Sequence, residues 1–108
     1  MIAHVVLLQP KPDLTGQQRA EALATIRESF ANLPDVRAVR LGTRVTHGLP
    51  GYEQLMKQDF EFAMIVEVDD ADALKRYLQA PAHEAIGNLF YSAASAALAY
   101  DYLMEEIL

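Results

Sequence analysis

The apolar residues of this sequence fall first into a short continuous run and then into a helical spacing. Residues 2–8 are almost all apolar, and the run ends at Pro10. Its length and its valine and isoleucine content predict a strand. A capping box beginning at Thr15 predicts the start of a helix. Apolar residues then recur on one helical face as far as Leu33, and Pro34 ends the pattern.

In the rest of the chain the spacing of apolar residues again changes between that of strands and that of helices. It predicts strands at 36–45, 60–68 and 98–103, and helices at 71–79 and from about 82 into the low 90s. Asp69 or Asp70 would cap the first of these helices, and Pro81 interrupts the helical pattern. Residues 46–58 carry glycine and proline and predict a long loop with a short helical turn near its end. Loops of this length are uncommon unless they are functional or mobile.

The predicted order is strand, helix, strand, strand, helix, strand, with the second helix broken at Pro81. This order is typical of the ferredoxin-like α+β fold, in which two helices cover one face of a four-stranded antiparallel sheet. A chain of 108 residues is one domain by length. We therefore expect a single domain over residues 1–108.

The strands are apolar on more faces than two helices can cover. In residues 2–8 both faces are apolar apart from His4, and in the third strand one face is unbroken: Phe60, Phe62, Met64, Val66 and Val68. A sheet face exposed to water should instead alternate with polar residues. We therefore expect a homodimer in which two sheets pack face to face as a barrel. The alternative is a monomer whose second face is covered by a ligand.

The charge balance argues against a nucleic-acid partner. Nine basic and fifteen acidic side chains give a net charge of -6, whereas nucleic acids are bound by positive surfaces. The one basic cluster, at Arg37, Arg40 and Arg44, is interpreted as a solvated strand edge. An acidic run is interpreted as surface together with a helix start, and comprises Asp59, Glu61, Glu67, Asp69, Asp70 and Asp72.

The chain contains no cysteine, which excludes disulfides, thiolate catalysis and cysteine-bound zinc. The first residues lack a basic segment and a cleavage site, and their apolar run is too short to span a membrane. We therefore expect Met1 to be the true start of a soluble, cytoplasmic protein with no membrane partner.

Three residues are candidates for catalytic chemistry. His83 lies near the start of a helical segment, where the helix dipole favours the neutral imidazole that a general base requires. Tyr77 could donate a hydrogen bond to a developing enolate. In an unbroken helix these two side chains would point about 120° apart, so only a break at Pro81 could turn both toward one cavity. His4 is unusual on an apolar strand face, because buried polar groups need partners.

Each candidate has a purely structural alternative. His83 could be a capping or core histidine, Tyr77 a core tyrosine with its hydroxyl at the surface, and His4 a histidine satisfied by a neighbouring hydroxyl or carboxylate. His47 lies in the loop and is expected to be exposed. The histidines lack metal-ligand spacing, and nucleotide-binding and hydrolase motifs are absent. We expect neither a metal nor a cofactor.

Several segments resemble the stress-responsive A/B barrel domain (Dabb) family, which belongs to the dimeric α+β barrel superfamily. Residues 77–83, YLQAPAH, are similar to that family's Y-x-x-x-P-x-H signature, and residues 2–8 are similar to its histidine-containing first strand. Residues 34–36 with 41–42 resemble the start of its second strand, and residues 100–102 resemble its ending. The resemblance implies a homodimer, and it leaves haem ligation by His83 or His4 as an alternative, since the superfamily includes haem-degrading members.

One family member is a plant polyketide cyclase that uses a histidine and a tyrosine for an aldol cyclisation. The resemblance implies these roles for His83 and Tyr77, with His4 at the matching first-strand position. Two features depart from this resemblance: Phe62 stands where the family often has a histidine, and around the first helix there is no tyrosine to match the cyclase's pocket, only Ile26 and Phe30.

Two hypotheses follow from these residues. The first is a cofactor-independent cyclase- or isomerase-type enzyme acting on a small carbonyl or polyketide-like substrate, with His83 as base, Tyr77 as oxyanion donor and His4 orienting the substrate. The second is a non-catalytic dimer that binds a small apolar ligand or serves as a stress-associated structural protein. They differ in whether the three side chains converge beside a cavity that solvent can reach.

Overall fold

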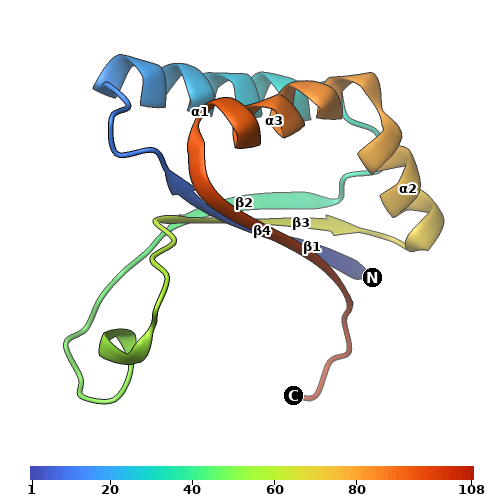
Figure 1. The fold of residues 1–108 in the computed structure, drawn as a ribbon. Helices are drawn as coiled ribbons and strands as arrows, with labels where there is room; N and C mark the ends of the chain where they lie inside the picture. Colours follow the sequence, from blue (N-terminus) through green and yellow to red (C-terminus); the bar gives the residue numbers. More distant parts are fainter.

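The computed structural model describes residues 1–108 as two layers, with the helices on one side of a four-stranded sheet (Figure 1). The elements are β1 (Ile2–Pro10), α1 (Gly16–Phe30), β2 (Ala38–Thr43), the short 3-10 helix η1 (Glu53–Leu55), β3 (Phe62–Val68), α2 (Ala71–Gln79), α3 (Pro81–Ser92) and β4 (Ala94–Leu103). This is the predicted α+β, ferredoxin-like arrangement. The predicted second helix is two helices, α2 and α3, which meet at Ala80.

The sheet is antiparallel throughout, with the strand order β2-β3-β1-β4. The register places His4 between Val66 of β3 and Asp101 of β4. It also places Val6 between Met64 and Ala99. Because side chains alternate along a strand, all of these residues share one face of the sheet. His4 and Asp101 therefore lie on the same face as the apolar core.

The core lies between the sheet and the helices. Its buried residues are Val6, Met64, Val66, Val68, Ala73, Tyr77 and Ile86. The unbroken apolar face of the third strand is therefore the face that the helices cover. That strand begins at Phe62 rather than at residue 60, so Phe60 does not belong to the run. The case for a partner consequently rests on the opposite face.

The opposite face of the sheet, the open face, is also largely apolar. Its middle row runs across three strands through Tyr100, Val5 and Ile65. Tyr100 is 53% exposed and Ile65 is 38% exposed. The neighbouring row contains Leu98, Leu7 and Ala63. No helix covers these residues, because all three α-helices lie on the other side of the sheet (Figure 1).

The last strand is longer than its predicted range of 98–103, because β4 begins at Ala94. The added residues, ASAA, favour a helix by propensity. Pairing with β1 decides their conformation, since Leu8 and Gln9 lie opposite Ala97 and Ala96. Tertiary pairing thus overrides local propensity in this segment.

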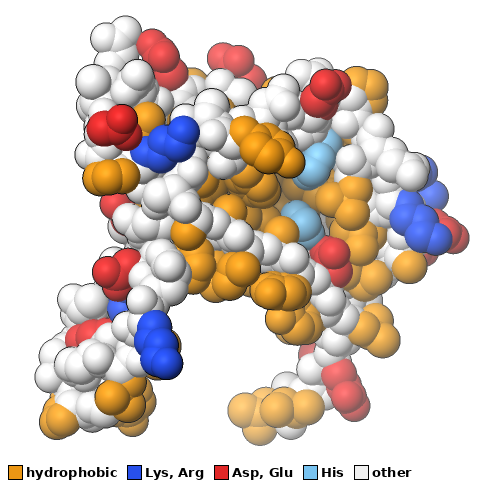
Figure 2. All heavy atoms as spheres, in the orientation of Figure 1, with side chains coloured by type: hydrophobic (Ala, Val, Ile, Leu, Met, Phe, Trp, Pro, Cys, Tyr) orange, Lys and Arg blue, Asp and Glu red, His pale blue; other side chains and the backbone are white.

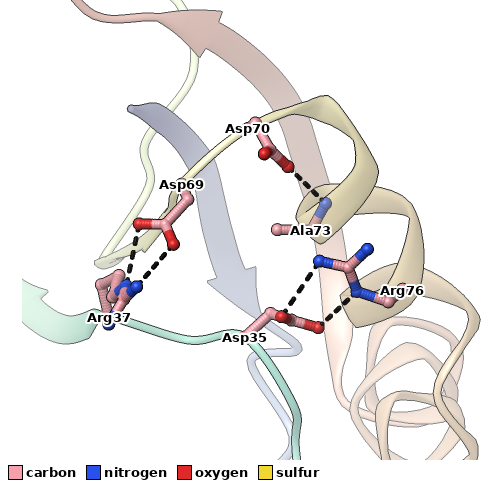
Figure 3. Close-up of polar contacts among 6 residues, drawn as sticks. All are labelled: Asp35, Arg37, Asp69, Asp70, Ala73 and Arg76. Atoms are coloured by element: carbon pink, nitrogen blue, oxygen red, sulfur yellow. Dashed lines mark hydrogen bonds and ion pairs between the residues drawn. The ribbon is translucent and has the colours of Figure 1, made fainter.

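Helix α2 is fixed by a cap and an ion pair at its start and by a second ion pair in its last turn (Figure 3). The Asp70 carboxylate accepts a hydrogen bond of 2.8 Å from the Ala73 backbone N–H, which satisfies an otherwise unpaired helix donor. The Arg37 guanidinium donates two hydrogen bonds to Asp69, and that of Arg76 donates two to Asp35. These arginines hold the pKa of both carboxyls below the usual range.

The basic cluster is matched to the acidic run. Arg37 pairs with Asp69, Arg40 with Glu67 at 3.9 Å, and Arg44 with Asp59. The three arginines are therefore engaged with the protein's own carboxylates. This agrees with their interpretation as a solvated strand edge. No helix in the structure combines the length and the apolarity needed to cross a bilayer.

Candidate functional site

Tyr77 lies at the centre of the candidate site, between the two predicted histidines. Its ring is fully buried on α2. The His83 ring approaches it edge-on with 5.0 Å between ring centroids, and the His4 ring does so at 5.6 Å. Phe30 of α1 stacks on it at 6.2 Å. All three residues singled out in the sequence are therefore brought together.

The break between α2 and α3 produces this arrangement. Ala80 has an extended backbone, with φ -65° and ψ 139°, and Pro81 is the first residue of α3. Proline is favourable at that position, because its missing N–H would be unpaired there in any case. The chain consequently changes direction between Tyr77 and His83, and both rings point into one space. The sequence predicted this role for the proline break.

His4 is held by a carboxylate that sequence reasoning did not assign to the site. Its Nδ1 lies 2.6 Å from Oδ1 of Asp101, its cross-strand partner on β4. This contact satisfies the buried imidazole, in agreement with the structural alternative for His4, and orients the ring from its Nδ1 side. The sequence did contain an indication that Asp101 belongs to the site. It is an acidic residue on the helix-facing side of β4, two residues from Ala99.

The Tyr77 hydroxyl is buried and has no hydrogen-bond partner. Burial, and secondly the charge of Asp101, raise the pKa of Tyr77 well above its usual value, so the hydroxyl keeps its proton. A buried polar group without a partner costs about 1–3 kcal/mol. Tyr77 is therefore a donor in need of an acceptor.

His83 has the complementary property. It is half-buried at the start of α3. Burial lowers its pKa, and the nearby His4 lowers it further. The helix N-terminus, which the sequence suggested as the cause, is not among these two influences. The outcome is nevertheless the expected one, because the neutral imidazole that can accept a proton is favoured.

An apolar cleft lies next to the three rings, between the helices and the sheet. Its volume is about 680 Å³ when the part open to solvent is counted, and 13 of its 15 lining residues are hydrophobic. Val6 and Ile86 line it; they follow His4 by two residues on the same strand face and His83 by one helical turn. Figure 2 shows the hollow, floored by apolar atoms, with histidine atoms at one end.

Small residues occupy part of the helix-facing side of the edge strand β4. Ala97 and Ala99 lie on the helix-facing side of this edge strand, yet both are exposed. The cleft lining includes Ala93, the residue just before β4, but no residue of β4 itself.

The three residues at which the resemblance breaks down are apolar parts of this region. Ile26 and Phe62 line the cleft, and Phe30 packs on Tyr77. The only charged residue in the lining is Arg19. It pairs with Glu61 and lies over the Phe62 ring, 5.7 Å from its centroid. The lining is therefore apolar apart from Arg19, and the rings of His4, Tyr77 and His83 lie beside the cleft rather than in its lining.

His47 does not join the site. Its ring contacts Glu53 at 3.0 Å and Tyr52 within the loop between β2 and β3. No group of three histidine or acidic side chains is placed to hold a metal ion. The arrangement at Tyr77 is instead suited to acid–base chemistry, since it combines a protonated donor with a neutral imidazole.

Proteins of known structure share this fold. A hydroxynitrile lyase from Passiflora edulis superposes with a TM-score of 0.82 at 15% identity, covering 99% of this chain and 95% of the lyase. A Dabb-family protein from Mesorhizobium loti has a TM-score of 0.76 at 20% identity, covering 97% of both chains. A dimeric ferredoxin-like protein of unknown function from Thermobifida fusca has a TM-score of 0.75 at 17% identity, covering 95% of this chain and 90% of that one.

These identities are low, so the similarity establishes the fold alone. No curated protein matches this chain. The family model of the stress-responsive A/B barrel domain matches residues 2–104. That range includes the histidine of the first strand, the tyrosine and histidine around the proline break, and the acidic residue of the last strand. The chain belongs to the stress-responsive A/B barrel domain (Dabb) family.

Proposed function

We propose that this protein is a cofactor-independent acid–base enzyme that acts on a small carbonyl or polyketide-like substrate, of the cyclase or isomerase type. The observation that carries the proposal is the buried, unpartnered hydroxyl of Tyr77 between two histidines. A protein that gained only stability from Tyr77 would do better with phenylalanine, because the hydroxyl costs free energy where it lies. A substrate oxygen would supply the missing acceptor.

The proposed roles follow from the state of each group. The neutral imidazole of His83 takes a proton from the carbon next to the substrate carbonyl. The electrons of the broken C–H bond move to the carbonyl oxygen, and the Tyr77 hydroxyl donates a hydrogen bond to the resulting enolate. In a cyclisation the enolate carbon attacks a second carbonyl of the same substrate. The new alkoxide then receives the proton that His83 carries.

His4 and Asp101 complete the site as a pair. A carboxylate on Nδ1 fixes the orientation of an imidazole and leaves Nε2 for the substrate. In this proposal His4 orients the substrate, and Asp101 acts through His4. The apolar cleft holds the remainder of the molecule, which favours a substrate with an apolar body and its carbonyl at one end. A hydroxynitrile lyase has the same fold, so this fold accommodates a catalytic site.

The proposal is tested by proton exchange at carbon. Small alkyl and aryl diketones are first screened by thermal shift on the unmodified protein. For each diketone that binds, incorporation of deuterium at the carbon next to the carbonyl is followed by NMR in D2O. We expect faster exchange with the unmodified protein, loss of most of the acceleration in His83→Ala, and unchanged acceleration in the control His47→Ala.

The second candidate is a non-catalytic protein that binds a small apolar ligand, and the apolar lining of the cleft favours it. The same experiment separates the two. Diketones that stabilise the protein without any acceleration of exchange would support the binding protein and contradict the enzyme. A diketone that stabilises His83→Ala as much as the unmodified protein would remove His83 from the site.

We also propose that the protein is a homodimer joined through the open face of the sheet. The support is the uncovered apolar rows through Val5 and Leu7. Structural neighbours from Thermobifida fusca, Bacteroides fragilis and Jannaschia are described as dimeric. Sedimentation at micromolar concentration should give twice the chain mass of 12.0 kDa, and a mass of one chain would contradict the dimer.

A further inference from the structure

The loop between β2 and β3, residues 44–61, is held by hydrogen bonds and ion pairs from its base at the sheet to its tip. We call it the arm. At the base, the Arg44 backbone N–H donates a hydrogen bond of 2.8 Å to the carbonyl of Glu61, and its guanidinium pairs with Asp59. Figure 1 shows the arm extending from the sheet on the side away from the helices. It therefore leaves the molecule on the side of the open face.

The interior of the arm is polar and fully engaged. Oε1 of Glu53 accepts hydrogen bonds from the backbone N–H groups of His47 and Gly48, at 3.1 and 2.6 Å. Its Oε2 lies 3.0 Å from Nε2 of His47, and the Leu49 N–H donates to Nδ1 of that ring at 3.0 Å. Hydrogen bonds to the backbone hold the pKa of Glu53 below its usual value. Glu53 thus organises the tip of the arm.

The outer surface of the arm is apolar, which inverts the usual arrangement of a loop. Five large hydrophobic side chains are between 58% and 86% exposed: Val45, Leu49, Tyr52, Leu55 and Met56. The C-terminal residues 104–108 also extend on the open-face side, from the opposite end of the strands, and carry exposed Met104 and Ile107 (Figure 1). Apolar atoms cover the tips of both extensions (Figure 2). A large ordered apolar surface of this kind marks an interface.

We propose that the arm is a dimerisation clasp whose apolar outer surface packs on the flank of a second copy of this chain. The inference rests on the homodimer proposed above and adds the element that grips the partner. Its surface is continuous with the open face on the same side of the sheet. An arm that extends beyond the plane of the open face must lie alongside any molecule that is bound to that face. The two-fold symmetry of a homodimer then gives two such contacts.

Charge selects the second copy as the occupant. Each chain carries a net charge of -6, so two copies repel each other unless they meet through surfaces that lack charge. The outer surface of the arm and the apolar rows of the open face carry little charge: apart from the exposed Lys57, the charged residues of the arm are turned inward or paired, and Arg40, at the β2 end of the middle row, is paired with Glu67. An oppositely charged partner would find little to bind on either surface.

The test compares dimer dissociation constants by analytical ultracentrifugation. The arm variant is Leu55→Gln with Met56→Gln, at positions 67% and 59% exposed. The control is Tyr91→Gln, at an 86% exposed position on α3 in the helix layer. Because each substitution occurs twice in a dimer, we expect the arm variant to weaken association by at least about tenfold. We expect the control to stay within about twofold of the unmodified protein.

The outcomes separate the clasp from the dimer. A dimeric unmodified protein whose dissociation constant is the same in the arm variant overturns the clasp and leaves the dimer. An unmodified protein that is monomeric throughout overturns both. Hydrogen exchange provides a second measurement on the intact chain: the backbone of residues 49–56 should become more protected as concentration rises through the dissociation constant, and protection independent of concentration contradicts the clasp.

Discussion

Tyr77 combines two properties that conflict at the level of a single residue. Its ring is part of the core, whereas its hydroxyl lies there without a partner. Removal of an unsatisfied buried group relieves its desolvation cost, but it also removes the only donor directed at a substrate oxygen in the proposed reaction. Stability and function should therefore respond to one substitution in opposite directions.

Tyr77→Phe tests this conflict. We expect the free energy of unfolding to stay constant or to rise by about 1 kcal/mol, while deuterium exchange of the diketone loses most of its acceleration. Chemical denaturation and NMR measure the two effects. Tyr91→Phe is the control, because Tyr91 is 86% exposed on α3 in the helix layer and its hydroxyl can bond to water. A clear loss of stability in Tyr77→Phe would show that the hydroxyl has a structural partner in solution.

His83 should make stability depend on pH. Its pKa in the folded protein is below the ordinary value of 6.5, chiefly because of burial. The unfolded chain therefore binds a proton at this residue more readily than the folded chain does. Stability must then rise with pH between the folded pKa and 6.5, and fall again as the solution is acidified through that window.

The measurement compares the unmodified protein with His83→Gln by denaturant unfolding from pH 8 to pH 5. We expect the difference in unfolding free energy between the two proteins to shift against the unmodified protein as the pH falls below about 6.5. The shift should level off once the folded His83 is protonated. The subtraction removes the contributions of titratable groups that do not interact with His83. A difference that is constant with pH would contradict a lowered pKa at His83.

The sequence predicted some residues of the site better than others. Tyr77 and His83 are close in sequence, so local geometry and the proline between them sufficed to bring them together. His4 could be recognised as a polar residue on an apolar strand face. Asp101 could not be paired with it, because the contact depends on the register of two strands at opposite ends of the chain, which local pattern does not fix.

At the level of the elements, the site depends on how α2 ends. Ala80 and Pro81 stop one helix and start the next, and His83 donates its backbone N–H to the Ala80 carbonyl at 2.9 Å. Proline also limits the conformations of the unfolded chain at this position. The same residue therefore contributes to stability and sets the direction in which His83 points.

Pro81→Ala separates these contributions from the chemistry of the side chains. We expect the free energy of unfolding to fall by about 0.5–1 kcal/mol, because the substitution restores freedom to the unfolded chain. We expect a larger proportional effect on diketone exchange, since alanine allows α2 to continue toward His83. Pro12→Ala, in the turn before α1, is a control for the proline effect alone. Equal effects of the two variants on exchange would contradict a positioning role for Pro81.

The elements of the fold could be predicted where the spacing of apolar residues agreed with the residues that start and stop an element. Helix α2 has the bounds that its capping aspartate and Pro81 indicated. The start of β4 could not be predicted, because its alanines carry no strand signal and only pairing with β1 makes them extended. The loop at 46–58 was recognised by its glycines and proline, but its internal order depends on Glu53 reaching back to His47 and Gly48, which spacing alone did not indicate.

At the scale of the whole molecule, the two faces of the sheet have different roles. The helix-facing side holds the core and the candidate site, and the open face is left for a partner. Because the two lie on opposite sides of one layer, a change on the open face should alter assembly without touching the rings around Tyr77. Assembly and site chemistry can therefore be separated by substitution.

Ile65→Glu is the substitution that separates them. Ile65 lies in the middle row of the open face beside Val5 and is 38% exposed, so a glutamate there can be solvated in a single chain. In the proposed dimer it would bring a carboxylate into an apolar contact on both subunits, and Arg40, its cross-strand neighbour on β2, is already paired with Glu67. Such burial is strongly unfavourable. We expect a monomer by sedimentation at concentrations where the unmodified protein is a dimer.

Leu78→Glu is the matched control, because Leu78 has nearly the same exposure, 37%, but lies on α2 in the helix layer. It introduces the same charge and should leave the dimer intact. If both variants dissociate, the added charge rather than its position is responsible, and the open face loses its special status. If only Ile65→Glu dissociates and still binds the diketone found by thermal shift, the site is complete within one subunit, since the cleft and all three rings belong to its own helix-facing side.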